Sequence, residues 1–352
     1  MGLPEILIEF KTNAVTAVKR SALGIVALIV KDDTPTFESK EYRDVSEILS
    51  TDYTAANLDY IKKAFDGTPS KVIVEVVGTE ASDYTTALAR LAVKKWNYLA
   101  IPGIEQTETT DIVSWIKSKR DNDKKTFKAV LPNAEADHEG VINFTTDGIV
   151  VGEKTYSASE YTTRIAGILA GLPFTRSATY YELPEIEAIT ESTTPDADID
   201  NGELILINDG ETFKIGRGVN SLKTTTIDKS EDFKKIKVVE VMDMISDDIR
   251  DTFKNSYVGK VPNTYDNQVL FFTSVNAYFK GLEGDDILDP NYANLATVDV
   301  QAQRLAWEGI GTDTTDWDDL KVKNMSFKSN VFAAANVKIT DAMEDLTFSI
   351  TI

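Results

Sequence analysis

Between residues 72 and 131 the chain alternates β-branched runs with amphipathic segments, and this alternation limits the possible folds more than any other feature. Residues 72–77 (VIVEVV), 98–101 and 127–131 are predicted strands, whereas residues 84–95 and 111–119 have apolar side chains at helical spacing. Strands that alternate with helices predict a largely parallel sheet with helices packed on its faces.

The longest apolar run, residues 22–30 (ALGIVALIV), is predicted to be a buried strand. It is about half as long as the ~20 residues that a membrane-spanning helix needs. A secretory signal is not expected either, because Glu5 and Glu9 precede the run and Lys31 and two aspartates follow it. We therefore expect a protein that is cytosolic when it is synthesised.

The second half of the chain is more helical in pattern. Helices are expected over residues 159–172, 240–255, 266–281 and 298–308, and a strand is expected over residues 331–339. Residues 177–211 contain ten Asp or Glu residues and no Lys or Arg, which predicts an exposed acidic connection.

The composition excludes several classes of function. The chain has no cysteine, so disulfides and thiolate chemistry are impossible, and its single histidine, His138, rules out any site that needs two imidazoles. Acidic residues outnumber basic ones 57 to 37, giving a formal net charge of −20. Such a surface repels phosphate backbones and anionic lipids, so no nucleic acid and no membrane is expected as a partner.

Two short motifs resemble ligand sites and are better explained without a ligand. Asp196, Asp198 and Asp200 have the spacing of a calcium loop, but Asn201 and Ile207 stand where that loop requires Gly and Glu. An exposed acidic turn is therefore predicted. Residues 216–218 (GRG) begin like a dinucleotide fingerprint, but no helix pattern follows, so a hairpin turn is predicted.

His138 is the only candidate for a catalytic base. It would need an orienting acid and a nucleophile, and although Asp137 or Glu139 could supply the acid, adjacent residues rarely have that geometry. A surface histidine is expected instead. No catalytic residue, metal site or cofactor is assigned.

Both ends of the chain are predicted to be strands with one apolar face. The apolar side chains alternate with polar ones in each strand: Ile6, Ile8 and Phe10 near the N-terminus, and Leu346, Phe348, Ile350 and Ile352 at the C-terminus. Short polar segments on the inner side of each strand are interpreted as hinges: Thr12 and Asn13, and Thr340 and Asp341.

Two interpretations of these terminal strands remain open. Each strand either pairs within the sheet of its own subunit or is donated to a sheet in a neighbouring copy, where main-chain hydrogen bonds join the chains. Apolar alternation that continues to the chain end favours donation, because termini are usually polar and frayed unless something holds them.

Four segments of the chain carry a resemblance to a known family: residues 3–30, residues 161–183 (YTTRIAGILAGLPFTRSATYYEL), residues 208–222 (NDGETFKIGRGVNSL) and the helical C-terminal region that ends in LTFSITI. With these segments the sequence resembles contractile tail sheath proteins of Gram-positive phages, of the Clostridium and Bacillus type, and of R-type phage-tail-like bacteriocins. The resemblance covers essentially the whole chain, although residues 3–7 (LPEIL) replace the Pro-Gly-Val-Tyr start of many such proteins.

The resemblance implies an α/β fold of mixed α+β character, in which a central α/β sheath domain is flanked by an inner α+β domain. Extended strand arms are implied at both termini. The implied divisions are an N-terminal strand arm at 1–20, a central α/β domain of subtilisin-like fold at 21–235, an inner helical and β domain facing the tube at 236–338, and a C-terminal strand arm at 339–352.

The family implies a structural role without a cofactor, not an enzyme. Its subunits stack as hexameric rings around an inner tail tube, and their terminal arms add strands to a small sheet on adjacent subunits. Rotation of the subunits during contraction drives the tube through a cell envelope. The implied partners are further copies of the chain and the tube, baseplate and tail terminator proteins. Assembly is implied in the host bacterial cytoplasm, and the product is a virion tail or a released tail-like particle.

Two further expectations follow from this interpretation. Lys234 and Lys235 belong to a lysine-bearing stretch that is predicted to contact the tube or a neighbouring subunit. The alternative functions are a hydrolase on a subtilisin-like fold, for which His138 is the only histidine available, and a different tail component such as a tube or baseplate protein.

Overall fold

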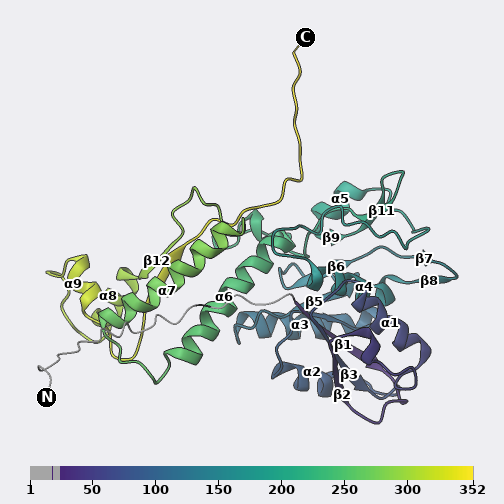
Figure 1. The fold of residues 1–352 in the computed structure, drawn as a ribbon, viewed down its shortest axis with the longest axis horizontal. Helices are drawn as coiled ribbons and strands as arrows, with labels where there is room; N and C mark the ends of the chain where they lie inside the picture. The colour runs from purple at the N-terminus through teal and green to yellow at the C-terminus, as the bar shows by residue number, and fades with distance from the viewer. Residues whose placement is uncertain (1–17, 19–23, 352) are drawn as a thin grey trace, which may run out of the picture. The chain divides into compact units, whose positions relative to one another are not determined.

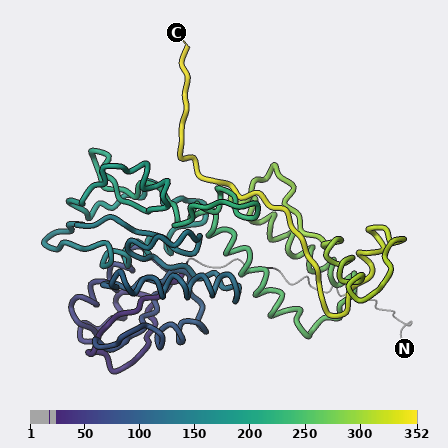
Figure 2. Tube along the Cα trace, turned by 180° about the vertical axis from the view of Figure 1, so that it is seen from behind, coloured from purple at the N-terminus to yellow at the C-terminus, as the bar shows by residue number. Residues whose placement is uncertain are grey.

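The computed structural model describes residue 18 and residues 24–351 of the chain. These residues form two compact units, which Figures 1 and 2 trace. The α/β unit contains residues 24–243 and 341–351, and the C-terminal unit contains residues 244–340. The predicted N-terminal strand with Ile6, Ile8 and Phe10, its hinge at Thr12 and Asn13, and the last residue, Ile352, all lie outside the described residues.

A seven-stranded sheet forms the centre of the α/β unit (Figure 1), and its strand order is β2-β3-β1-β4-β5-β6-β9. The strands are β1 (Ile25–Lys31), β2 (Ser39–Tyr42), β3 (Lys71–Val77), β4 (Tyr98–Ala100), β5 (Lys128–Pro132), β6 (Val141–Phe144) and β9 (Glu203–Leu204). The edge strand β2 is antiparallel to β3, and every other pairing in this sheet is parallel. The predicted parallel sheet is confirmed.

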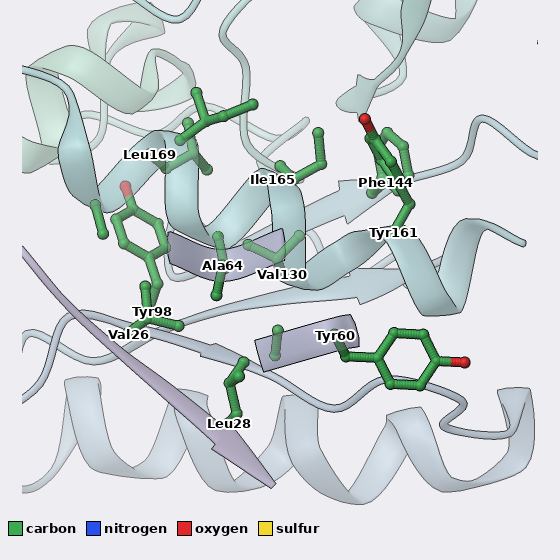
Figure 3. Close-up of a cluster of buried hydrophobic side chains, with 14 of the residues drawn as sticks. Val26, Leu28, Tyr60, Ala64, Tyr98, Val130, Phe144, Tyr161, Ile165 and Leu169 are labelled. Atoms are coloured by element: carbon green, nitrogen blue, oxygen red, sulfur yellow. The ribbon is translucent and has the colours of Figure 1, made fainter. Parts of the chain in front are cut away.

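Helices cover both faces of this sheet. Helices α1 (Ala55–Phe65) and α4 (Ala158–Gly171) contribute to the core on one face, and α2 (Thr85–Ala92) and α3 (Gln106–Asp121) contribute to the core on the other. Neighbouring residues of β1 enter opposite cores, because successive strand side chains point to opposite faces. Figure 3 shows the first core, in which Leu28 and Ile165 are among the buried side chains. Burial on both faces explains why the strands appear as continuous apolar runs.

The helix α4 begins at a capping box. The Ser157 amide donates to Oε2 of Glu160 at 2.9 Å, and the Glu160 amide donates back to the Ser157 hydroxyl at 3.4 Å. This exchange satisfies amides that have no partner at a helix start. From there the helix is buried along nearly all of its length, so the predicted helix at 159–172 is confirmed as the central helix of this unit.

The acidic stretch at 177–211 is more ordered than predicted. It contains α5 (Pro195–Asp200) and the edge strand β9, and Leu183 and Leu204 are fully buried, so the prediction of an exposed connection was wrong in part. The residues of the apparent calcium loop lie on α5, which is a helix.

Two small hairpins and two short 3-10 helices complete the unit. They are β7 (Ile149–Val151) with β8 (Lys154–Tyr156), β10 (Leu206–Asn208) with β11 (Phe213–Ile215), and the 3-10 helices η1 (Val45–Glu47) and η2 (Glu231–Lys234). The chain reverses between β10 and β11, before residues 216–218. The hairpin turn predicted at residues 216–218 was therefore wrong, because this glycine pair follows the hairpin.

The C-terminal unit is built on two long helices. Helix α6 (Ile236–Ser256) begins in the α/β unit and ends in this one, and α7 (Tyr265–Gly284) follows. The remaining elements are β12 (Leu295–Val298), α8 (Val300–Glu308), α9 (Asp319–Asn324) and β13 (Ala333–Asn336). The three helices predicted in this region are confirmed, whereas β12 and α9 were not foreseen.

Within residues 24–351, no helix is both long enough and apolar enough to cross a bilayer.

Candidate assembly interface

The C-terminal segment leaves its alternating apolar side chains exposed and is not part of a strand among the described residues. Leu346, Phe348 and Ile350 are 88%, 76% and 75% exposed, and residues 341–351 form no ladder with any other described residue. Figure 2 shows this segment as an extended yellow trace. In water, three exposed apolar side chains on one face of an extended segment are unfavourable, so the segment has the properties of a strand that lacks its partner.

A second unpaired feature is the hairpin of β12 and β13. These strands pair antiparallel, with Leu295 opposite Asn336 and Val298 opposite Ala333, and within the described chain they form a sheet of only two strands. All four residues of β13 are exposed. Such a sheet presents unpaired main-chain donors and acceptors along its edges, which can pair with a further strand.

The predicted C-terminal hinge joins the two units. The Thr340 amide donates to the carbonyl of Ile287 at 2.9 Å in the C-terminal unit, whereas the next residue, Asp341, forms an ion pair with Lys235 in the α/β unit. Burial alone would raise the pKa of Asp341, but the hydrogen bonds from Lys235 and from the Ala342 amide, together with the charges of Lys235 and Lys237, outweigh burial and hold the pKa below its usual range.

The lysines predicted to contact a partner are engaged within the chain. Lys234 lies 2.8 Å from Glu231 on the short helix η2, and Lys235 pairs with Asp341. An electrostatic contact with another molecule through these two side chains therefore remains a prediction. To form it, each lysine would either contact the other molecule in addition to its present partner or give that partner up.

The prediction that His138 is a surface residue was wrong, because its side chain is only 5% exposed. Its Nδ1 accepts a hydrogen bond from the Gly140 amide at 3.0 Å, which requires this nitrogen to carry no proton. Its Nε2 lies 3.5 Å from Asp121 and 3.8 Å from Glu139. Burial lowers the pKa of His138, and these two carboxylates offset the effect only in part. The imidazole is a buried structural group that faces an amide and two carboxylates.

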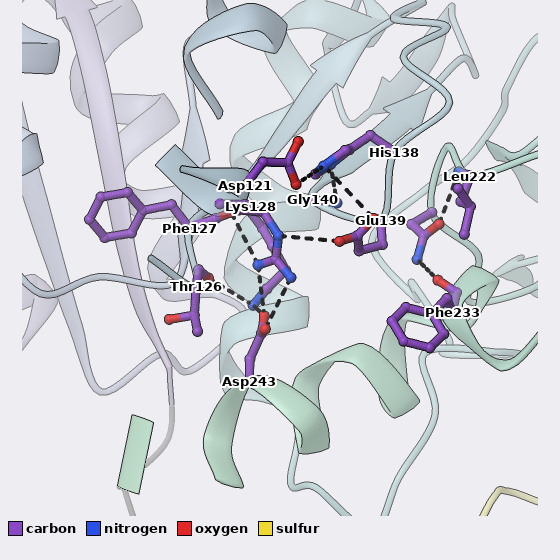
Figure 4. Close-up of polar contacts among 12 residues, drawn as sticks. Asp121, Thr126, Phe127, Lys128, His138, Glu139, Gly140, Leu222, Phe233 and Asp243 are labelled. Atoms are coloured by element: carbon purple, nitrogen blue, oxygen red, sulfur yellow. Dashed lines mark hydrogen bonds and ion pairs between the residues drawn. The ribbon is translucent and has the colours of Figure 1, made fainter. Parts of the chain in front are cut away.

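A buried charge network near His138 was not foreseen from the sequence (Figure 4). Both oxygens of Asp243 on α6 accept hydrogen bonds from Arg120 on α3, each at 3.0 Å, and Lys128 on β5 lies 2.7 Å from the same carboxylate. Lys128 is also 2.9 Å from Glu240, one turn earlier on α6. A lysine inside an otherwise apolar strand was the one sequence signal for this network.

Pairing overcomes burial in this network. Burial by itself would raise the pKa of Asp243, but the nearby Lys128 and Arg120 hold it below its usual range. For Lys128, burial would lower the pKa and the carboxylates of Asp243 and Glu240 raise it instead. Asp243, Lys128 and Arg120 are therefore all charged at neutral pH. Their buried ion pairs fix the first turns of α6 to the sheet.

Comparison with protein families gives two matches that together span most of the chain. Residues 78–221 match the phage tail sheath protein central domain, and residues 228–352 match the phage tail sheath C-terminal domain. The chain is also 38% identical, over 99% of both lengths, to the tail sheath protein of the Clostridium phage phiCD119.

Solved structures share the fold at low sequence identity. The sheath tail protein of Desulfitobacterium hafniense is 18% identical, with a TM-score of 0.71 over 84% of this chain and 94% of that protein. The helical sheath of the anti-feeding prophage in its contracted state is 13% identical, with a TM-score of 0.72 over 100% of this chain and 99% of that protein.

Proposed function

We propose, on the premise that this chain belongs to the phage tail sheath protein family, that it polymerises by donating its terminal strands to neighbouring copies. The observation that carries the proposal is the exposed apolar face of Leu346, Phe348 and Ile350 on an unpaired extended segment. Pairing with a sheet edge would satisfy the main-chain groups of this segment and bury its apolar side chains together.

The acceptor is the hairpin of β12 and β13 in an adjacent copy. This hairpin has only two strands among the described residues, and β13 is exposed along its whole length. Burying each large apolar side chain contributes about 1.5–3 kcal/mol, and each ladder hydrogen bond adds about 0.5–1.5 kcal/mol net. Ordering the donated residues costs about 1–2 kcal/mol each, so one arm alone gives little net binding free energy.

The N-terminal strand with Ile6, Ile8 and Phe10 is proposed as the second attachment, because two tethers per subunit multiply the effective affinity.

The lattice built in this way is a contractile sheath. The subunits form stacked hexameric rings around an inner tube, with baseplate and terminator proteins at the ends, assembled in the bacterial cytoplasm. The energy of contraction is stored in a metastable extended lattice, in which the contacts between subunits are poorer than in the contracted lattice. Calorimetry of triggered particles should then detect released heat as better contacts form, and heat uptake on contraction would contradict an energy store of this kind.

Strand donation is tested by substitutions on the two faces of the C-terminal segment. Phe348→Asp places a charge on the apolar face, and it should raise the protein concentration needed for polymerisation by at least about tenfold, the equivalent of ~1.4 kcal/mol per contact. Ser349→Asp places the same charge on the opposite face and serves as the matched control. Sedimentation and negative-stain microscopy measure the polymer, and thermal unfolding of the dilute protein should be unchanged in both variants because both positions are exposed.

Equal polymerisation by the two variants would refute strand donation. Truncation of residues 1–12 tests the N-terminal arm in the same way and should abolish the striated tubes seen by microscopy. If the truncated protein still formed striated tubes, the N-terminal arm would not be needed for polymerisation.

The alternative of a hydrolase is not favoured by the surroundings of His138. A catalytic triad needs a hydroxyl nucleophile beside the imidazole and one orienting acid. The nearest serine hydroxyl in the hydrogen-bond network, that of Ser221, instead bonds the main chain of His138, donating to its carbonyl at 2.9 Å. We therefore propose a structural role. His138→Gln should leave polymerisation intact.

A further inference from the structure

The described part of the C-terminal arm reverses the usual distribution of polar and apolar side chains. Met343, Leu346, Phe348 and Ile350 are exposed, whereas the side chain of Glu344 is only 9% exposed. A carboxylate is rarely buried unless it is paired, so the burial of Glu344 indicates a specific seat on the α/β unit.

The seat of Glu344 is formed by two hydroxyl groups. Its Oε1 lies 2.8 Å from Oγ of Ser177 and 2.6 Å from Oγ1 of Thr179, both in the loop after α4. These hydroxyls are held in place, since Oγ of Ser177 accepts from the Thr179 amide at 3.1 Å and Oγ1 of Thr179 accepts from the Gly218 amide at 2.9 Å. The Thr179 hydroxyl donates to the carboxylate, and the single proton of the Ser177 hydroxyl is shared between the carboxylate and Oγ1 of Thr179, which lies 3.0 Å away.

Gly218 packs closely against this loop. A Cβ there would lie 3.2 Å from Oγ of Ser177 and 3.3 Å from the Thr179 nitrogen. A larger residue at this position would therefore require the two hydroxyls that hold Glu344 to shift by a few tenths of an ångström.

Two basic side chains flank the seat. Arg217 lies 2.6 Å from Asp345 and 3.9 Å from Glu344, and Lys235 pairs with Asp341. Three acidic residues within five positions of the chain are thus bound to three separate segments of the α/β unit: the loop after α4, the residues after β11 and the residue before α6. We call Asp341, Glu344 and Asp345 the carboxylate clamp.

We infer that the carboxylate clamp fixes the base of the C-terminal arm to its own α/β unit and so directs the apolar segment 346–352 at one neighbouring copy. This inference rests on the proposed strand donation and adds how the arm is aimed. The freely moving part then begins at Leu346, beyond the hinge predicted at Thr340 and Asp341.

The consequence is a shorter reach. Residues 346–352 span at most ~25 Å when extended, whereas an arm free from residue 341 onward would span ~43 Å. The accessible volume falls with the cube of the reach, so the clamp raises the effective concentration of the apolar segment near its acceptor roughly fivefold.

The first test measures whether the arm is held. Because the chain has no cysteine, spin labels can be placed at Glu182→Cys on the α/β unit and Thr347→Cys on the polar face of the arm. Pulsed electron paramagnetic resonance on the dilute full-length protein should give a narrow distance distribution. Glu344→Gln with Asp345→Asn should broaden it, and the matched pair Glu187→Gln with Glu191→Gln, which removes two exposed carboxylates, should leave it narrow.

The second test measures polymerisation by the same variants. Glu344→Gln with Asp345→Asn leaves the Asp341–Lys235 ion pair in place, so the freed arm of residues 342–352 spans ~40 Å. The concentration needed for polymerisation should therefore rise about fourfold in this variant and should not change in Glu187→Gln with Glu191→Gln. A broad distribution in the unsubstituted arm, or unchanged polymerisation by a clamp variant whose distribution has broadened, would overturn the inference. Failure of the underlying strand donation gives a different result, because Phe348→Asp would then polymerise as well as Ser349→Asp whatever the distance distribution.

Discussion

At the scale of single residues, three glycines decide how α1 and α4 pack. A Cβ on Gly167 would lie 2.1 Å from the carbonyl oxygen of Ala64, and one on Gly171 would lie 1.8 Å from that of Gly67. A Cβ on Gly67 would in turn lie 2.0 Å from the carbonyl carbon of Gly167. The obstacles are main-chain atoms, which cannot move aside as a flexible side chain can. The close contact of these helices therefore depends on the absence of side chains.

Gly167→Ala should destabilise the α/β unit by about 3 kcal/mol or more, because the added methyl group forces the helices apart. Gly281→Ala is the matched control on α7, where a Cβ would meet nothing within 4 Å, and it should stabilise its helix by about 0.5–1 kcal/mol. Hydrogen exchange of β1 and of α7 in increasing urea measures the two effects. If both substitutions changed the free energy of unfolding only slightly, α1 and α4 would not be in such tight contact.

At the scale of elements, helix α6 is fixed to the α/β unit by buried charge as well as by apolar packing. Asp243 is the last residue of the first segment of the α/β unit, and its carboxylate accepts hydrogen bonds from Arg120 on α3 and Lys128 on β5. The helix thus leaves the unit directly after a buried ion pair. This arrangement holds the start of α6 against rotation, since a bidentate pair has a defined geometry.

Asp243→Asn should reduce the free energy of unfolding by about 3–5 kcal/mol, because it leaves two buried cations without their shared partner. Asp66→Asn, at a half-exposed carboxylate 3.6 Å from Lys63, should change it by less than about 1 kcal/mol. Urea unfolding of both variants at neutral pH provides the comparison, and a loss below 1 kcal/mol for Asp243→Asn would contradict the network's role.

The same network predicts a pH dependence with a defined sign. The pKa of Asp243 is lowered in the folded protein, so its contribution to stability is complete above the unfolded value near 3.9 and is lost as the pH falls through the folded value. The acid-induced loss of stability should therefore be smaller in Asp243→Asn than in the unsubstituted protein, as measured by urea unfolding between pH 6 and pH 3.

At the scale of the whole molecule, a net charge of −20 opposes assembly into a lattice of identical copies. Like-charged subunits repel over about 10 Å at 0.1 M salt and over about 30 Å at 0.01 M. Polymerisation should therefore accelerate when monovalent salt rises from about 0.01 M to about 0.1 M, as followed by light scattering. Sucrose is a non-ionic control, and slower polymerisation with added salt would show that attractive ion pairs between subunits dominate.

The sequence alone determined the local pattern of this protein. β-Branched and apolar runs predicted β3, β4 and β5, and helical spacing predicted helices α2, α3, α4, α6, α7 and α8. Most of these elements bury an apolar face or run, whereas Gln303 is the buried residue of α8. The sequence also showed that apolar and polar side chains alternate over residues 346–350. It could not show whether this segment pairs within its own subunit or with another copy, because both arrangements have the same alternation.

Only the tertiary structure decided which charged residues meet. Asp243 accepts a hydrogen bond from Arg120, which lies more than a hundred residues earlier in the chain. His138 is buried although the residues around it in the sequence are polar. Glu344 accepts hydrogen bonds from the hydroxyls of Ser177 and Thr179. Periodicity reports which face of an element avoids water, but a charged side chain is buried by whatever distant partner the fold brings to it. That partner is not encoded by spacing along the chain.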